Sequence, residues 1–171
     1  MGTPRKQRRK YSRPAHPWKL ERITEEKELC LKYGLKNKKS IWKIRSMLAR
    51  IRDQAKLLLA ASGEKAEKDK LELISKLNVW GIAAKSIDDI LALDATALLD
   101  RRLQSIVVKR GLAKTPKEAR QFIVHRHIWV GAHKITIPSY IVLASEEETV
   151  RLADEIAKVK EGAGKEVKEA G

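Results

Sequence analysis

The stretch that decides the fold is residues 115–137, TPKEARQFIVHRHIWVGAHKITI, where helical spacing of apolar residues changes to alternation. Thr115 suits a helix N-cap, Pro116 the first helical position, and Glu118 the third. This helix would bury Ala119, Phe122 and Ile123. After Arg126 the period falls to two around a turn near Gly131, and the apolar positions are Ile128, Val130, Ile135 and Ile137. The stretch predicts a helix followed by a β-hairpin with one apolar face.

The residues on either side of this stretch predict two more helices. One reaches Arg110 from about Asp94 and stops at Gly111, which tolerates the left-handed conformation. Three of its polar residues share an outer face at i, i+3 and i+7, namely Arg102, Ser105 and Lys109. After the hairpin, Ser145 and the acids that follow it form a capping box, which predicts a C-terminal helix over residues 146–161 and a flexible tail over 162–171.

The first hundred residues divide into a tail and a helical part. Residues 1–20 are rich in bases and proline but hold almost nothing to bury, so they predict a basic tail that becomes ordered only on binding. Residues 21–98 predict an N-terminal helical lobe that begins with a helix over about 24–33. The next helix is capped by Ser40 and ended by Ser62-Gly63, and its apolar stripe is Ile41, Ile44, Leu48, Ile51, Ala55 and Leu58. A third helix over about 64–77 has the stripe Leu71, Ile74 and Leu77, and a short helix is capped by Ser86. A domain of two helices and a hairpin then occupies residues 99–145. The fold class is therefore mostly α with a small β-hairpin (α+β).

Positive charge is concentrated in two zones of the chain. The 171 residues contain 37 Lys and Arg against 22 Asp and Glu, a formal net charge of +15. Residues 1–60 carry 18 of these bases with 5 acids, and residues 101–143 carry 9 with Glu118 as the one acid. Surfaces selected for solubility usually mix both signs. Segregated charge instead predicts two contact surfaces for a polyanion.

Several classes of protein are disfavoured by what the sequence lacks. Cys30 is the one cysteine, which excludes an intramolecular disulfide and a multi-cysteine zinc site and favours a reducing compartment. The longest apolar run, residues 57–61, is too short to cross a bilayer, and the first residues are not a secretory signal. We find no Gly-rich phosphate loop, nucleophile elbow or acid pair near a histidine. We therefore expect no enzyme, cofactor, metal, membrane or small-molecule substrate.

The sequence resembles a known family over nearly its full length. Ala119-Arg120-Gln121, then His125-Arg126-His127-Ile128-Trp129-Val130, then Ile137-Pro138-Ser139-Tyr140 resemble the S-four-type RNA-binding domain. Nearer the N-terminus, His16-Pro17-Trp18, Lys32-Tyr33-Gly34-Leu35-Lys36-Asn37-Lys38 and Ile41-Trp42-Lys43 look like the small-subunit ribosomal protein four family in its archaeal form.

The resemblance implies a structural constituent of the small ribosomal subunit. A member would be a primary binder of 16S-type rRNA that organises the subunit body during assembly. It would lie beside neighbouring small-subunit ribosomal proteins, act in translational accuracy, and be cytoplasmic. The chain departs from bacterial relatives in two ways. It has Arg126 where they read His-Gly-His-Ile, and Cys30 alone cannot supply the zinc site that some of them carry.

Basic, amide and imidazole side chains are the candidate RNA contacts. In the tail they are Arg5, Lys6, Arg8, Arg9, Lys10 and Arg13, and in the helical lobe Lys38, Lys39, Lys43, Arg45 and Arg52. In the domain they are Arg102, Lys109, Lys114, Lys117, Arg120, Gln121, His125, Arg126 and Lys134. Arginine ranks above lysine because its guanidinium fork matches phosphate. The histidines suit hydrogen bonding better than metal binding, because neither carboxylate nor cysteine lies near them in sequence.

Two questions stay open at the level of sequence. Trp18, Trp42 and Trp129 lie among Lys and Arg residues in the sequence. An aromatic ring in such a place stacks either on nucleobases or on its own protein. The order helix, turn, helix, hairpin is also that of a winged-helix DNA-binding protein, which is the alternative function. An RNA-modifying enzyme with an appended domain of this type is disfavoured, because the upstream residues offer no catalytic domain.

Overall fold

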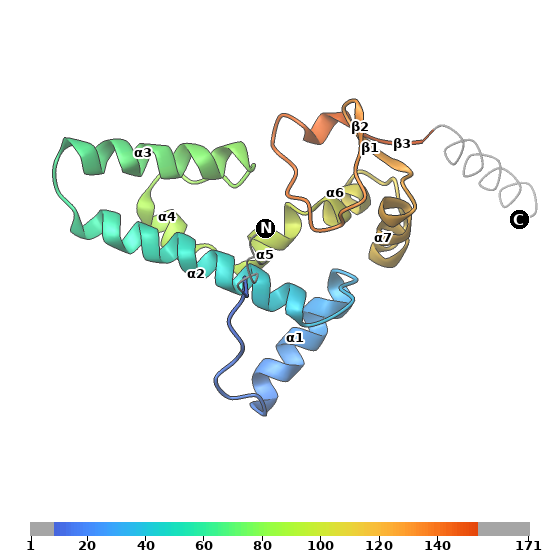
Figure 1. Cartoon of the computed structure of the whole chain (residues 1–171), viewed down its shortest axis with the longest axis horizontal. Coiled ribbons are helices and arrows are strands. Elements are labelled where there is room, and N and C mark those ends of the chain that lie inside the picture. Colours follow the sequence, from blue (N-terminus) through green and yellow to red (C-terminus); the bar gives the residue numbers. More distant parts are fainter. Residues whose placement is uncertain (1–8, 154–171) are drawn as a thin grey trace, which may run out of the picture. The chain divides into compact units, whose positions relative to one another are not determined.

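The computed structural model describes residues 9–153, which form two compact units (Figure 1). Residues 9–75 and 84–99 belong to the N-terminal unit, and residues 76–83 and 100–153 belong to the C-terminal unit. No helix within residues 9–153 is both long and apolar enough to cross a membrane.

Helices build the N-terminal unit. Its centre is α2 (Lys39–Ala60), which contacts α1 (Leu20–Lys32) and α4 (Ile87–Ala92). The predicted apolar stripe of α2 is confirmed, since its buried residues are Ile41, Ile44, Leu48, Ile51 and Ala55. The predicted capping box at Ser86 is confirmed as well. Both α1 and α2 begin earlier than predicted, and α2 follows Lys38 rather than a serine cap.

Two further helices each begin in the N-terminal unit and end in the C-terminal unit. They are α3 (Glu64–Val79) and α5 (Ala95–Asp100). Of the predicted stripe of α3, Leu77 is buried and Ile74 is half-buried, whereas Leu71 is 67% exposed. Leu73, which was not predicted, is buried. The prediction is therefore wrong at Leu71 only.

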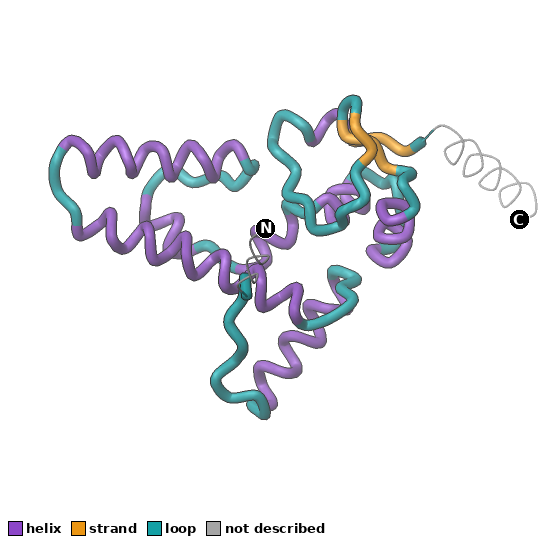
Figure 2. Tube along the Cα trace, viewed as in Figure 1, coloured by secondary structure: helices purple, strands orange, loops and turns teal. Residues whose placement is uncertain are grey.

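The C-terminal unit packs two helices against a small sheet. The helices are α6 (Leu103–Lys109) and α7 (Pro116–Val124), and Figure 2 shows the strands in orange. β1 (Ile128–Val130) lies between β2 (His133–Lys134) and β3 (Val150–Leu152), and both pairings are antiparallel. The core cluster of the unit contains Leu103, Ile106, Val107, Ala113, Ala119, Ile123, Ile128, Val130, Val142, Val150 and Leu152. The fold class is confirmed, with a third strand added to the hairpin.

The predicted helix from Asp94 to Arg110 is interrupted. Between α5 and α6, Arg102 has an extended backbone (φ −74°, ψ 144°). The Leu103 N–H donates to the carbonyl of Tyr140 at 2.8 Å, and the Val142 N–H donates to the carbonyl of Arg101 at 3.1 Å. Because this backbone pairs with the segment after the hairpin, it cannot continue a helix. A long-range contact therefore overrides a continuous local pattern.

The C-terminal helix predicted over residues 146–161 is wrong in its described part. Residues 147–149 form a short 3-10 helix, η1 (Glu147–Thr149), and β3 follows at once. Val150 and Leu152 are buried and Arg151 is exposed, which is the alternation of a strand. Residues 154–161 and the predicted tail over 162–171 lie outside the described residues. The second strand of the hairpin is also shorter than predicted, and Ile137 is 58% exposed.

Two arginines of the C-terminal unit hold η1 and β3 in place. Arg101 pairs with the carboxylate of Glu147 at 2.5 Å and donates to the carbonyl of Val142 at 3.0 Å. Arg110 donates to the carbonyl oxygens of Glu147 and Val150, the latter at 3.1 Å. These two arginines of the second positive zone therefore stabilise the fold through contacts within the protein.

Candidate nucleic-acid interface

Two arginines lie close enough for their charges to interact where α6 packs on α7. Arg102 caps α6 and is 5% exposed, while Arg120 on α7 is half-buried. Burial, together with the positive charge of Arg120, lowers the pKa of Arg102 below its ordinary value. Within residues 9–153, the Nε and Nη1 atoms of Arg102 have no hydrogen-bond partner. Neither arginine forms an ion pair in that part of the chain.

The chemistry of this pair favours an anion. A guanidinium keeps its proton in proteins, so burying it without a partner destabilises the fold. A phosphate oxygen accepts several N–H bonds from such a fork and would relieve the repulsion between the two charges. The prediction that Arg102 faces outward beside Lys109 is wrong, because Arg102 precedes α6 instead of lying within it. Lys109 is exposed and lies 3.6 Å from the carboxylate of Asp100.

The outer face of α7 extends this positive surface. The predicted start of the helix is confirmed, with the Thr115 hydroxyl accepting from the Glu118 N–H at 3.2 Å and a proline at the first position. Ala119 and Ile123 are buried, so the opposite side faces solvent. The nominated side chains exposed there and in the preceding turn are Lys114, Lys117 and Gln121.

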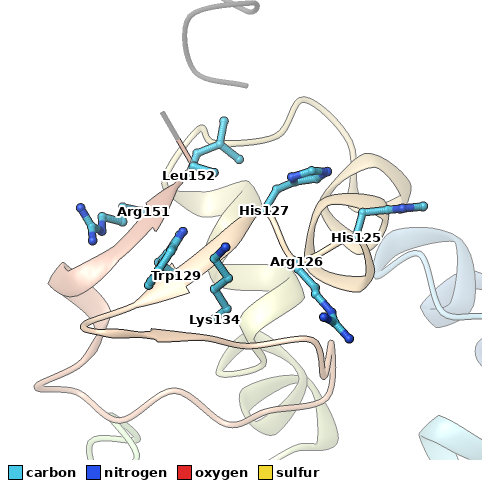
Figure 3. Close-up of a pocket in the computed structure, with 8 residues that line it drawn as sticks. His125, Arg126, His127, Trp129, Lys134, Arg151 and Leu152 are labelled. Carbon is cyan, nitrogen blue, oxygen red and sulfur yellow. The ribbon is translucent and has the colours of Figure 1, made fainter. Parts of the chain in front are cut away.

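A cavity of about 370 Å³ lies over the sheet on the same unit, and Figure 3 shows its lining. Trp129 lies between Lys134 and Arg151, whose charges stand 4.8 and 5.4 Å from the ring centroid. The sheet register explains this, because Trp129 is the cross-strand partner of both residues. His125 and His127 stack at 6.3 Å nearby. Trp129 therefore supports two cations at the mouth of a basic hollow.

Sequence reasoning missed Arg151 as a member of this surface. The capping box places Arg151 in a predicted helix over residues 146–161, where its side chain has no predicted neighbours on the hairpin. The only signal was a period of two over residues 150–152, which is too short to outweigh the capping box before it.

In the N-terminal unit, one buried carboxylate organises several cations. Glu26 on α1 is 0% exposed, and its oxygens lie 2.7 Å from Arg22, 3.6 Å from Lys38 and 3.7 Å from Arg45. The indole N–H of Trp42 donates to Glu26 at 3.0 Å. Burial raises the pKa of Glu26, but the hydrogen bonds from Trp42 and Arg22 and the charges of Arg22 and Lys38 outweigh it, so this pKa lies below its usual value.

Glu26 was also missed from the sequence, although a signal existed. It lies on the apolar side of α1, three residues after Ile23 and four before Cys30, where an acid is out of place unless it is paired. Two nominated RNA contacts, Lys38 and Arg45, are therefore held by an internal acid. Arg45 also pairs with Glu25 at 3.3 Å.

The remaining nominated residues occupy varied places. Arg52 donates to the carbonyl of Leu93, and Arg9 lies 5.7 Å from the ring centroid of Tyr11. The exposed candidates in the N-terminal unit are Arg9, Lys10, Arg13, Lys39 and Lys43. Arg5, Lys6 and Arg8 lie outside the described residues. Within residues 9–153, no group of three or more His, Cys, Asp or Glu is placed to hold a metal ion.

Comparison with known proteins places this surface in a family. A family model described as "S4 domain" matches residues 101–148. The small ribosomal subunit protein uS4 of Methanococcus aeolicus is 47% identical over 153 residues, covering 88% of this chain and 86% of the relative. This chain belongs to the uS4 family. Its counterpart in Methanothermobacter thermautotrophicus is 47% identical over 152 residues, with 88% and 89% covered, and that of Methanococcus maripaludis is 42% identical over 153 residues, with 88% and 86% covered.

These matches confirm the resemblance stated from the motifs. The S4-domain match includes both arginines of the α6–α7 pair, and also Arg126 and Lys134. It ends before β3, so Arg151 lies beyond the matched segment.

Arg126 occupies a backbone conformation that favours glycine. Its φ is +66°, and it is the one non-glycine residue with positive φ among residues 9–153. The bonds that require this conformation close α7, with the His127 N–H donating to the carbonyl of Phe122 at 2.9 Å and the Arg126 N–H to that of Ile123 at 3.1 Å. In this uS4 chain a strained backbone position therefore carries an exposed cation beside the basic hollow.

Arg126→Gly is expected to stabilise the protein by about 1 kcal/mol, because glycine removes the steric penalty of the left-handed region. The same change should weaken binding of small-subunit rRNA, because an exposed cation is lost. Thermal unfolding and filter binding measure the two effects. Arg126→Lys is the control that keeps both the charge and the strain. An unfolding temperature for Arg126→Gly at or below that of Arg126→Lys would contradict the assignment of strain.

Proposed function

We propose that this protein is a structural, non-enzymatic component of the small ribosomal subunit that binds 16S-type rRNA. The observation that carries the proposal is the buried guanidinium of Arg102, which has two unpaired nitrogens beside the like charge of Arg120. Such a pair is a poor internal arrangement and a good receptor for an RNA phosphate. The names of the relatives, small ribosomal subunit protein uS4, support the same conclusion.

In the proposed mechanism the two units contribute different contacts. The α6–α7 pair and the outer face of α7 would hold the backbone of folded RNA by charge and shape, without reading sequence. The hollow beside Trp129 would extend that contact. The cations gathered around Glu26 would form the second contact surface, joined by the basic tail over residues 1–20. Organising the subunit body during assembly, contacting neighbouring ribosomal proteins in the cytoplasmic ribosome, and supporting translational accuracy belong to the same proposal.

A binding comparison tests this function directly. Affinity for small-subunit rRNA should exceed affinity for duplex DNA of equal length at equal salt. If about six to ten phosphates are neutralised, raising salt from about 50 to 200 mM should lower rRNA affinity by about 10³-fold or more. Preference for duplex DNA would overturn the ribosomal proposal in favour of the winged-helix alternative.

A further inference from the structure

A second hollow, in the N-terminal unit, has the lining of a nucleotide site. It measures about 520 Å³ and lies between the segment at residues 11–18 and the first turns of α1 and α2. The rings of Trp18 and Trp42 line it together with the cations Arg13, Arg22, Lys38 and Lys39 and the acid Glu26. The carboxylate of Glu26 is neutralised by its pairs with Arg22 and Lys38. Flat aromatic surfaces beside positive charges match the two parts of a nucleotide, a planar base and an anionic phosphate.

The segment that forms one wall of this hollow is fastened to the helices. The Ser12 N–H donates to the hydroxyl of Ser46 at 2.9 Å. Arg22 donates to the carbonyls of His16 at 3.1 Å and Pro17 at 2.7 Å. Two prolines in the segment further restrict its backbone. The wall is therefore formed before any ligand arrives, which lowers the entropy lost on binding. Within residues 11–18 this differs from the prediction of a tail that becomes ordered only on binding, because the bonds from Ser12 and Arg22 hold the segment in the free protein.

The two tryptophans differ in how far the protein itself holds their rings. Trp42 is held by its bond to Glu26 and by Tyr11, whose ring centroid lies 6.1 Å away. Trp18 is 90% exposed although it lines the hollow. Trp18 therefore presents an aromatic face to solvent beside a preformed basic hollow, which is the arrangement on which a nucleobase stacks.

We propose that this hollow takes one unpaired nucleotide of the bound RNA, with its base stacked on Trp18 and its phosphate among Arg13 and Lys39. The inference rests on the proposed function, because it assumes that the polyanion is RNA. It goes beyond backbone contact, since it assigns the N-terminal unit a site for a base. It also distinguishes the sequence alternatives for these rings, with Trp42 anchored to its own protein and Trp18 stacking on RNA.

The test uses the full-length protein and a single-stranded hexaribonucleotide with 2-aminopurine at its centre, whose fluorescence is quenched by stacking. Trp18→Ala should weaken binding about tenfold, as loss of one stacked base predicts, and should abolish the protein-dependent quenching. Trp18→Phe should retain most of both signals. Leu20→Ala removes a neighbouring side chain that is 73% exposed but does not line the hollow, so it should change neither signal.

Comparing different ligands shows whether the hollow recognises a nucleobase. The same hexaribonucleotide with a central abasic site should bind wild type about as weakly as the complete oligonucleotide binds Trp18→Ala. The proposal is overturned if the intact oligonucleotide does not bind, if Trp18→Ala behaves like Leu20→Ala, or if poly-glutamate competes as well as RNA. Binding of small-subunit rRNA by the same preparations is measured in parallel. If it persists while the Trp18 effect is absent, this inference fails and the proposed function stands.

Discussion

Arg120→Glu is expected to weaken binding of small-subunit rRNA by about 100-fold, the scale at which loss of a desolvated charge contact is usually felt. The new carboxylate would stand beside the buried guanidinium of Arg102 and pair with it. One substitution would therefore remove two phosphate contacts. Because it also replaces a like-charge contact with an opposite-charge one, thermal stability should be kept or increased.

Filter binding at fixed salt measures the affinity, and thermal unfolding followed by circular dichroism measures the fold. Lys68→Glu is the matched control, since it makes the same charge change at an exposed position of α3, where acids and bases are mixed. It should lower affinity only slightly. Equal losses for the two variants would show that net charge, and not the arginine pair, determines binding. Loss of helical signal together with affinity would show that Arg120 supports the fold.

Glu26→Ala is expected to destabilise the protein by about 3 kcal/mol, as removal of one partner from a buried ion pair usually does. The change leaves Arg22, Lys38 and Arg45 close together without their acid and leaves the indole N–H of Trp42 without its acceptor. Urea unfolding followed by far-ultraviolet circular dichroism measures the free energy of unfolding. Glu25→Ala is the control, because this neighbouring acid is 62% exposed and pairs with Arg45 at the surface. Its loss should change the free energy of unfolding by less than about 1 kcal/mol. Equal effects of the two substitutions would contradict the role given to burial.

The pH dependence of stability provides a second test of Glu26. Its pKa in the folded protein lies below the usual 4.5, because hydrogen bonds and positive neighbours outweigh burial. The ionised carboxylate therefore contributes stability above that pH, and this contribution is lost as pH falls through the folded pKa. Wild type should lose stability below about pH 4.5 more steeply than Glu26→Gln. Parallel curves for the two proteins would contradict this account.

Local signals were sufficient for the elements that depend on local interactions. The cap at Thr115 and the stripe of α2 were predicted correctly, because a capping hydroxyl and a run of helical repeats act within a few residues. The hairpin followed from alternation in β1. β3 was not predictable in the same way, since three alternating residues cannot outweigh a capping signal unless β1 is known to lie beside them.

The candidate interface was predictable in composition but not in geometry. Charge segregation predicts which segments carry the candidate contacts, and Lys114, Lys117 and Gln121 are exposed there. The sequence alone does not show which Lys and Arg side chains are buried or form ion pairs within the protein. Arg102 is buried because the helix breaks before it, and Arg45 is paired because Glu26 lies across from it. Both outcomes depend on contacts between elements that are distant in the chain.

The position of β3 determines where the RNA-binding domain can be cut. The S4-domain match ends at residue 148, yet Val150 and Leu152 belong to the core and pair with β1, and the unit also includes residues 76–83. A fragment trimmed to the matched residues would present the unpaired edge of β1 to solvent together with Ile128 and Val130. Such an edge recruits further chains, so that fragment would tend to precipitate. An excised domain that stays in solution therefore has to run from about Lys76 through at least Ala153.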